Sequence, residues 1–183
     1  MYSLNVPLPP AVSRLTSDLY PKLSGFDRVR DRHTLVCKRF GVDDIGRGEP
    51  DRLRPPKSEA VETLRRDLGG LLSGTVPFEV AVTGIDAFES PTSGAGPVVY
   101  LVVESDELVR LHRRLCAAYD VIEGIEGDEY VPHVTLARGG DPDRRALDRL
   151  IGTDIEPVRW RVHALDLYDA EFREVAGTVT LRV

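Results

Sequence analysis

The alternation of strand-like and helix-like segments along the chain is the feature that most restricts its fold. Apolar residues recur at every second position in the strand-like segments and on one helical face in the others. The helical segments are 11–23, 58–72, 105–119 and 141–150, and the strand segments are 2–8, 33–40, 78–88, 98–103, 131–138, 158–168 and 175–183. This order is β-α-β-α-β followed by β-α-β-α-β-β, which predicts an α+β fold with a duplicated unit.

Residues that favour helix caps and turns support these helix and strand boundaries. Pro9-Pro10 ends the first strand and suits the first turn of a helix. Ser58 and Ser105 are candidate N-caps. The segment 41–57 holds three glycines and three prolines and is predicted to be a loop.

Size and composition narrow the class of protein. A length of 183 residues fits one unit, 1–183, made of a compact domain or two small lobes. Neither a membrane-spanning apolar run nor a signal-peptide pattern is visible, so we expect a cytoplasmic protein. Cys37 and Cys116 predict neither a disulfide framework nor a metal cluster. A net charge of −6 does not suit a non-specific duplex-DNA coat, which needs clustered cations.

A short motif occurs twice, and it carries the chemistry. Arg32-His33-Thr34-Leu35-Val36 corresponds to Pro132-His133-Val134-Thr135-Leu136 in the second half. Residues i and i+2 of a strand point to the same face, so His133 and Thr135 project together. Two histidines across a cleft can accept and donate protons near neutral pH, while a hydroxyl binds a phosphate oxygen. This pattern suits phosphodiester hydrolysis without a metal.

The second motif, 132–138, closely resembles the His-x-Thr signature of the 2H phosphoesterases, which include 2′-5′ RNA ligases and RNA 2′,3′-cyclic phosphodiesterases. In element order the resemblance extends over 1–183. It implies a bilobed fold in which two curved antiparallel sheets surround a central cleft, with helices outside and one motif from each lobe. The resemblance also implies that His133 is catalytic and that Thr135 binds the phosphate.

The first motif departs from this signature, because the residue two positions after His33 is Leu35. In one register His33 faces the cleft, Leu35 takes the position of the hydroxyl residue, and Thr34 points away unless a bulge turns it. In the other, Thr34 matches Thr135 and Arg32 occupies the position of the histidine. A slip of one residue exchanges the two faces of a strand, so a regular strand admits only one register.

Hydrophobicity does not separate the two registers, because one buries Lys38 and the other buries Arg39. Two-histidine chemistry favours the first, with His33 and His133 as the catalytic pair. An arginine in place of the histidine would bind phosphate but could not act as a base. The candidate substrate-binding residues are Thr135, Thr34, Arg32, Arg138 and Lys38.

Other polar residues receive structural assignments. His112 is expected on the solvent-exposed face of its helix, and His163 is left out of the site. Tyr130 is expected to pack in the core. The acidic loop 123–129 does not match a calcium-binding pattern, so neither a metal nor an organic cofactor is expected.

The function that we expect is hydrolysis of a 2′,3′-cyclic phosphate on RNA ends or nucleotides to a phosphomonoester. The alternative is a non-catalytic member that binds RNA ends or nucleotides, with Arg32 in place of the first histidine. The expected partners are RNA ends or nucleotides that carry a cyclic phosphate. We expect no membrane partner and no duplex DNA, and a monomer.

Overall fold

A computed structural model describes residues 1–41, 44–45 and 57–182. The helices are α1 (Pro10–Leu19), α2 (Lys57–Leu71), α3 (Asp106–Cys116) and α4 (Arg144–Ile151), with short 3-10 helices η1 (Tyr20–Leu23) and η2 (Gly127–Glu129). The strands are β1 (Tyr2–Val6), β2 (Arg28–Val29), β3 (Leu35–Phe40), β4 (Phe78–Phe88), β5 (Val98–Glu104), β6 (His133–Arg138), β7 (Val158–Val162), β8 (Ala164–Asp169) and β9 (Glu174–Thr180). The predicted loop 41–57 lies largely outside the described residues.

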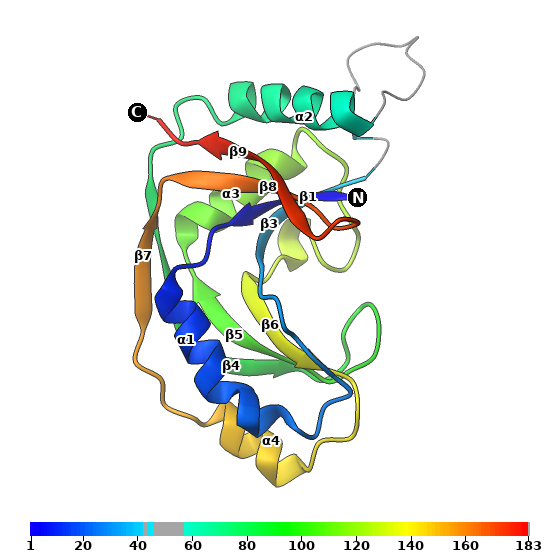
Figure 1. Cartoon of the computed structure of the whole chain (residues 1–183), viewed down its shortest axis with the longest axis vertical. Helices are drawn as coiled ribbons and strands as arrows, with labels where there is room; N and C mark the ends of the chain where they lie inside the picture. Colours follow the sequence, from blue (N-terminus) through cyan, green and yellow to red (C-terminus); the bar gives the residue numbers. More distant parts are fainter. Residues whose placement is uncertain (42–43, 46–56, 183) are drawn as a thin grey trace.

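The strands form one curled antiparallel sheet in the order β7-β4-β5-β6-β3-β1-β8-β9, with β2 paired to β6 (Figure 1). Its two halves meet where β3 pairs with β6 through Leu35 and Val134. The halves diverge from this junction, which gives the predicted pair of curved antiparallel sheets. The predicted α+β class is confirmed.

The two halves of the sheet do not correspond to the two halves of the sequence. The predicted strand 158–168 divides at His163 into β7, which pairs with β4, and β8, which pairs with β1. The strand predicted to end the first unit, β4, pairs with β5 of the second. Each half of the sheet is therefore built from both halves of the sequence. The chain crosses between the halves before β4 and again at His163.

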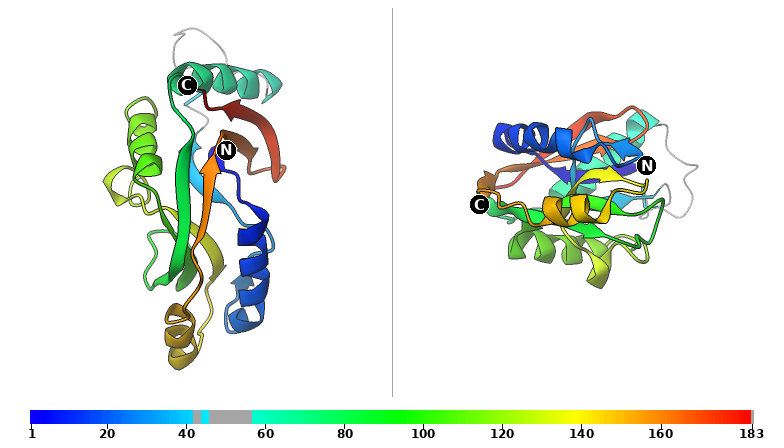
Figure 2. Two further views of the ribbon diagram at one scale, coloured as in Figure 1. Left: turned by 90° about the vertical axis from the view of Figure 1, so that its left-hand side faces the viewer. Right: turned by 90° about the horizontal axis from the view of Figure 1, so that it is seen from below.

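The helices cover both faces of the sheet. Figure 2 shows α1 and α3 on opposite sides of the strands, and α3 packs on β3 and β4. Its apolar stripe, formed by Leu108, Leu111 and Leu115, is buried. The predicted cap Ser105 accepts a hydrogen bond from the Leu108 amide at 3.3 Å, which satisfies one free donor of the first turn.

A buried ion pair joins β3 to the segment that leads into β6. Lys38 Nζ lies 2.7 Å from Glu126 Oε2, and the two side chains are 0% and 1% exposed. The same ammonium donates to the carbonyls of Arg39 and Asp120 at 2.6 and 2.8 Å, so its three donors are used. Glu126 Oε1 accepts from the Arg39 amide at 2.8 Å. The expectation that Lys38 binds phosphate does not agree with this structure, because its charge is already paired.

Replacing Lys38 by Met tests the contribution of this pair. We expect Lys38→Met to lower the free energy of unfolding by about 3–5 kcal/mol, because Glu126 is left as an unpaired buried charge. Urea unfolding measures the change. The control is Arg65→Met, which breaks the half-exposed Arg65–Glu62 pair and should cost less than about 1 kcal/mol. Equal effects of the two variants would contradict a structural role for the buried pair.

Candidate active site

The two motifs meet at the junction between the halves of the sheet. Leu35 of β3 pairs with Val134 of β6. In an antiparallel pair the preceding residue of one strand faces the following residue of the other, which sets Thr34 opposite Thr135. Both threonines and His133 line one cleft of about 660 Å³. The site is therefore built around a pair of hydroxyl residues, one from each half.

The structure brings Arg32 and Thr34 to this cleft and does not bring His33 there. His33 lines a neighbouring cavity of about 720 Å³. The expected pairing of His33 with His133 is thus not what the geometry provides. The physical reason is the period of two: Arg32, Thr34 and Val36 alternate toward the cleft, so His33 takes the opposite phase together with the buried Leu35.

A bulge explains why hydrophobicity favoured neither register. The pairing of β1 with β3 shifts between Leu4 and Asn5, which makes Cys37 an extra residue in β3. The buried residues of β3 are Leu35, Cys37, Lys38 and Phe40. Arg39 lines the cleft beyond the bulge. Leu35 and Cys37 follow one predicted register, and Lys38 and Phe40 follow the other.

The ring of His133 is held in a defined orientation. Its Nδ1 lies 2.7 Å from the carbonyl oxygen of Val131. A carbonyl only accepts, so Nδ1 carries the proton and Nε2 of the neutral ring keeps its lone pair. Phe88 and Tyr100 approach the ring edge-on, with centroid distances of 5.4 and 5.3 Å. These contacts fix the tautomer and the plane of the ring.

The surroundings of His133 favour its neutral form. Burial lowers the pKa of the imidazole, and the nearby charges of Arg39 and Arg138 lower it further. The hydrogen bond to Val131 opposes this shift but is outweighed. A neutral imidazole with a free Nε2 is a proton acceptor at neutral pH, which is the property required of a general base.

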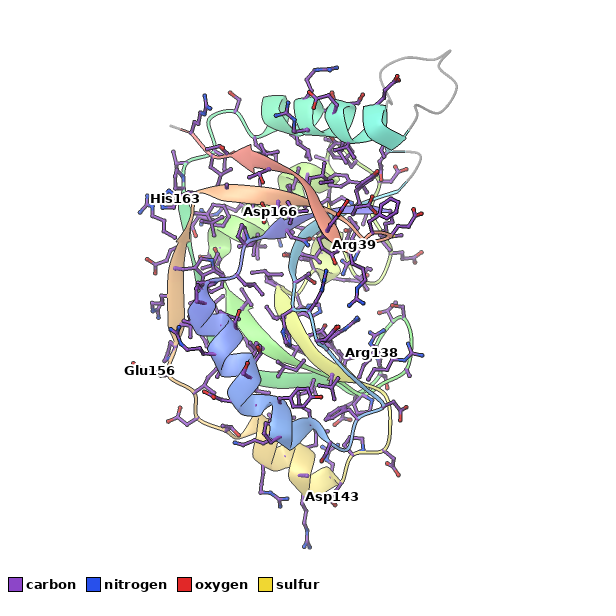
Figure 3. The ribbon with its side chains drawn as sticks, in the orientation of Figure 1. Arg39, Arg138, Asp143, Glu156, His163 and Asp166 are labelled. Atoms are coloured by element: carbon purple, nitrogen blue, oxygen red, sulfur yellow. The ribbon has the colours of Figure 1, made fainter. Side chains whose placement is uncertain are left out.

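Positive charge is concentrated around the cleft of a protein whose net charge is −6. The arginines that line it are Arg30, Arg32, Arg39, Arg138 and Arg173. Glu129 is the one carboxylate among its described lining residues. Arg39 and Arg138 lie on different sides of the opening, one near each half of the sheet (Figure 3). Guanidinium groups can pair with anionic groups such as phosphates, so the cleft has the charge that an anionic ligand needs.

Arg138 has hydrogen-bonding capacity to spare. Its Nε is buried and has no partner among the described residues. Burial lowers the pKa of its guanidinium, and the charges of Arg30 and Arg28 add to this effect. A Cβ on Gly94, which has φ +77°, would lie 2.7 Å from Arg138 Nη1. Glycine therefore lets the loop after β4 close over this arginine.

The hairpin of β8 and β9, whose turn carries Arg173, positions Arg32 at the cleft. Its Nη1 donates to the carbonyl of Arg173 at 2.5 Å. Arg173 in turn forms an ion pair with Asp31 at 3.0 Å. These contacts join the segment before β3 to the turn between β8 and β9, so both arginines stand at the cleft.

The sequence did not indicate several residues that line the cleft. Arg30 and Arg173 were not among the candidates, and Phe88 was assigned only to a strand. A signal for Arg30 was present, because arginine recurs at positions 28, 30 and 32 and Thr34 follows in phase. Nothing in the local sequence of Arg173 indicates that its hairpin returns to the first motif.

The expectation that His112 lies on the surface is wrong. His112 is 0% exposed and lies between β3 and the segment before β6. Its Nδ1 is 2.6 Å from the carbonyl of Cys37, and its Nε2 accepts from the Gly127 amide at 2.8 Å. Its ring stacks on Tyr130 at 3.8 Å, and the Tyr130 hydroxyl donates to the Val36 carbonyl at 2.8 Å. This network holds the segment that carries the Val131 carbonyl.

This network predicts a pH dependence of stability. Burial lowers the pKa of His112 below its usual 6.5, so between the two pKa values the unfolded chain binds more protons than the folded one. The stabilisation is full above pH 6.5 and falls as the pH is lowered. We expect His112→Asn to reduce this pH dependence by about 1 kcal/mol or more between pH 7 and 5, as measured by urea unfolding.

The matched control is the exposed His163, whose replacement by Asn should leave the pH dependence unchanged. His33 and His133 contribute in the same direction, since burial lowers the pKa of each. A residual slope in His112→Asn is therefore expected. A slope identical to that of the wild type would contradict the role of His112.

The described residues hold no group of three or more His, Cys, Asp or Glu side chains that would bind a metal ion. Nor does any of the described helices have the length and hydropathy needed to cross a membrane.

The chain is similar to a known family and to several solved structures. The family model of the 2′-5′ RNA ligase superfamily matches residues 50–172. The protein TT0787 of Thermus thermophilus has a TM-score of 0.61 and 21% identity, with 99% of this chain and 97% of that chain covered. No curated protein matches the sequence.

Two structures of E. coli LigT share the fold. The complex with NADP+ has a TM-score of 0.56 and 17% identity, with 100% of this chain and 97% of that chain covered. The complex with 3′-AMP has a TM-score of 0.55 and 16% identity, with 99% and 94% covered. The curled antiparallel sheet with its flanking helices is thus a fold that this chain shares with these proteins.

Proposed function

The chain belongs to the 2′-5′ RNA ligase superfamily, and from this premise we propose that it hydrolyses a 2′,3′-cyclic phosphate on an RNA end or nucleotide to a phosphomonoester. The observation that carries the proposal is the orientation of His133: the Val131 carbonyl holds its Nδ1, and its Nε2 has no partner among the described residues, in a cleft lined by five arginines. A cleft of this charge attracts a phosphate. The free imidazole nitrogen supplies the base that hydrolysis needs.

The reaction begins with the phosphate bound between the two threonines and the arginines. Thr34 and Thr135 each have a hydroxyl that can donate to a phosphate oxygen, and the guanidinium groups of Arg39 and Arg138 neutralise its charge. Because Arg138 Nε is buried without a partner among the described residues, a phosphate oxygen there would satisfy it. Binding would thus remove the free-energy cost of a buried N–H donor that has no hydrogen-bond partner.

His133 then activates water. Its Nε2 accepts a proton as the water oxygen bonds to phosphorus, and the bond from phosphorus to one ribose oxygen breaks. The electron pair stays on that ribose oxygen, which the arginines stabilise until it takes a proton from solvent. The imidazolium then returns its proton to solvent, and the product is a ribose phosphomonoester.

This mechanism uses one histidine instead of the expected pair. His133 is the one histidine among the described residues that line the cleft. Arg32 stands two residues before Thr34, as His133 stands two residues before Thr135. Arginine at this position stabilises charge on the leaving oxygen but does not supply a proton, because a guanidinium group is not deprotonated in proteins. No step of this mechanism uses a metal.

Solved structures with a similar fold support a nucleotide as the class of ligand. One structure of E. coli LigT is a complex with 3′-AMP, a ribose phosphomonoester, and another is a complex with NADP+. In this chain, a cleft of about 660 Å³ with five arginines is suited to a ligand of that kind.

A second candidate function is binding of the same RNA ends or nucleotides without turnover. It is favoured by Arg32, which occupies the position where the two-histidine mechanism needs a second proton carrier. The candidates share the cleft and the ligand, and they differ only in whether the phosphate is hydrolysed. Turnover by the wild-type protein therefore separates them.

The test is hydrolysis of the four nucleoside 2′,3′-cyclic monophosphates in the presence of EDTA. We expect the wild type to hydrolyse at least one of them. We expect His133→Ala to lower kcat at least about 100-fold, because the base is lost. Arg32→Ala should lower kcat at least about tenfold, through loss of charge stabilisation.

His163→Ala is the matched control, because His163 is exposed and lines neither cavity. It should retain the wild-type kcat. Wild-type kcat in His133→Ala would refute the assigned base. Absence of turnover by the wild type, together with binding of a nucleoside 3′-phosphate, would favour the non-catalytic candidate.

A further inference from the structure

We propose that the cavity beside the cleft binds the nucleoside of the substrate and that it selects a guanine base. The inference rests on the proposed function, since it assumes that the arginine-lined cleft holds the phosphate. The cavity has a volume of about 720 Å³ and lies between α1, the end of β1, β8 and the segment before β3. It also gives a role to His33, which the cleft leaves unused.

The cavity and the cleft are neighbours on one face of the sheet. Thr34 and Tyr168 line both. In the register of the sheet, Asn5 pairs with Val36 on one side and with Asp166 on the other. Cross-strand partners share a face, so Asn5 and Asp166 lie on the face that carries Val36 of the cleft. A phosphate in the cleft and a base in the cavity are therefore separated by shared wall residues.

Asn5 and Asp166 form a pair of hydrogen-bond acceptors in this cavity. Asn5 is only 6% exposed, and its Oδ1 has no hydrogen-bond partner among the described residues. Asp166 accepts from the Thr178 hydroxyl through Oδ1 at 2.9 Å, which leaves Oδ2 able to accept another bond. A buried acceptor without a partner indicates a missing donor, and a ligand is a natural source of it.

The charge of the cavity is opposite to that of the cleft. Its described lining contains the carboxylates of Asp31 and Asp166 and no lysine or arginine. Asp31 is paired with Arg173, which lies on the cleft side. A phosphate is repelled by such a lining, whereas N–H donors are attracted. The arginine-lined cleft therefore suits the phosphate of a nucleotide, and the adjoining cavity suits its base.

Among the bases, guanine fits the acceptor pair best. It presents a ring N–H beside an exocyclic amino group, two adjacent donors that a carboxylate and an amide oxygen can accept together. Uracil offers one N–H flanked by two carbonyl oxygens, and these would face the Asp166 carboxylate. A site that hydrogen-bonds a donor discriminates strongly against an analogue that lacks it.

Aromatic and imidazole rings complete the cavity. Tyr20 lines it and is 60% exposed, so a base can stack on its ring. His33 also lines it, and burial lowers the pKa of its imidazole, so its ring is available as a neutral hydrogen-bonding group. Asp31 acts in the opposite direction on that pKa, and Arg30 acts with the burial.

Isothermal titration calorimetry with 3′-GMP, 3′-UMP and inorganic phosphate tests the inference without requiring turnover. We expect the wild type to bind 3′-GMP at least about tenfold more tightly than 3′-UMP, and phosphate more weakly than either. Asp166→Asn should bring the two nucleotides to within about threefold and leave the Kd of phosphate unchanged. Asp18→Asn, on the exposed side of α1, removes the same charge outside the cavity and should keep the wild-type preference.

Equal affinity of the wild type for the two nucleotides, or a preference for 3′-UMP, would overturn the guanine site. If phosphate still binds in that case, the proposed function stands. If phosphate and both nucleotides fail to bind, the cleft itself is wrong, and the proposed function fails together with the guanine site.

Discussion

The buried pair of Lys38 and Glu126 is the interaction on which the geometry of the site depends. It joins β3 of one half of the sheet to the segment that precedes β6 of the other. The same segment supplies the Val131 carbonyl that fixes the tautomer of His133. Because a buried charge without its partner is strongly unfavourable, the two halves are held in one relative arrangement. The stacked rings of His112 and Tyr130 reinforce this connection.

This arrangement separates opposite charges on one face of the sheet. Five arginines line the cleft, while the adjoining cavity carries carboxylates and an amide oxygen without a partner among the described residues. A protein of net charge −6 can therefore bind an anion, because the local charge differs from the total. Under the proposed function, the same separation would orient a nucleotide, with its phosphate and its base on different sides of Thr34 and Tyr168.

Much of the fold could be predicted from sequence because the periodicities are local. The helix over 105–119 and its Ser105 cap follow from patterns within a few residues. The site was harder to predict, because the register of β3 depends on a bulge at Cys37 that only the pairing with β1 reveals. The burial of His112 could not be predicted from local patterns, because its partner Cys37 lies far away in the chain and its partner Gly127 lies in an irregular segment. Arg173 reaches the cleft through a hairpin whose return no local pattern encodes.

We propose that His133, and not His33, shares the cleft with the phosphate. Histidine NMR during a pH titration tests it most directly, with signals assigned from the His33→Ala and His133→Ala variants. Bound inorganic phosphate stabilises a nearby imidazolium, so it should raise the pKa of His133 clearly and leave that of His33 nearly unchanged. Equal increases for both histidines would show that they flank one phosphate and would contradict this account.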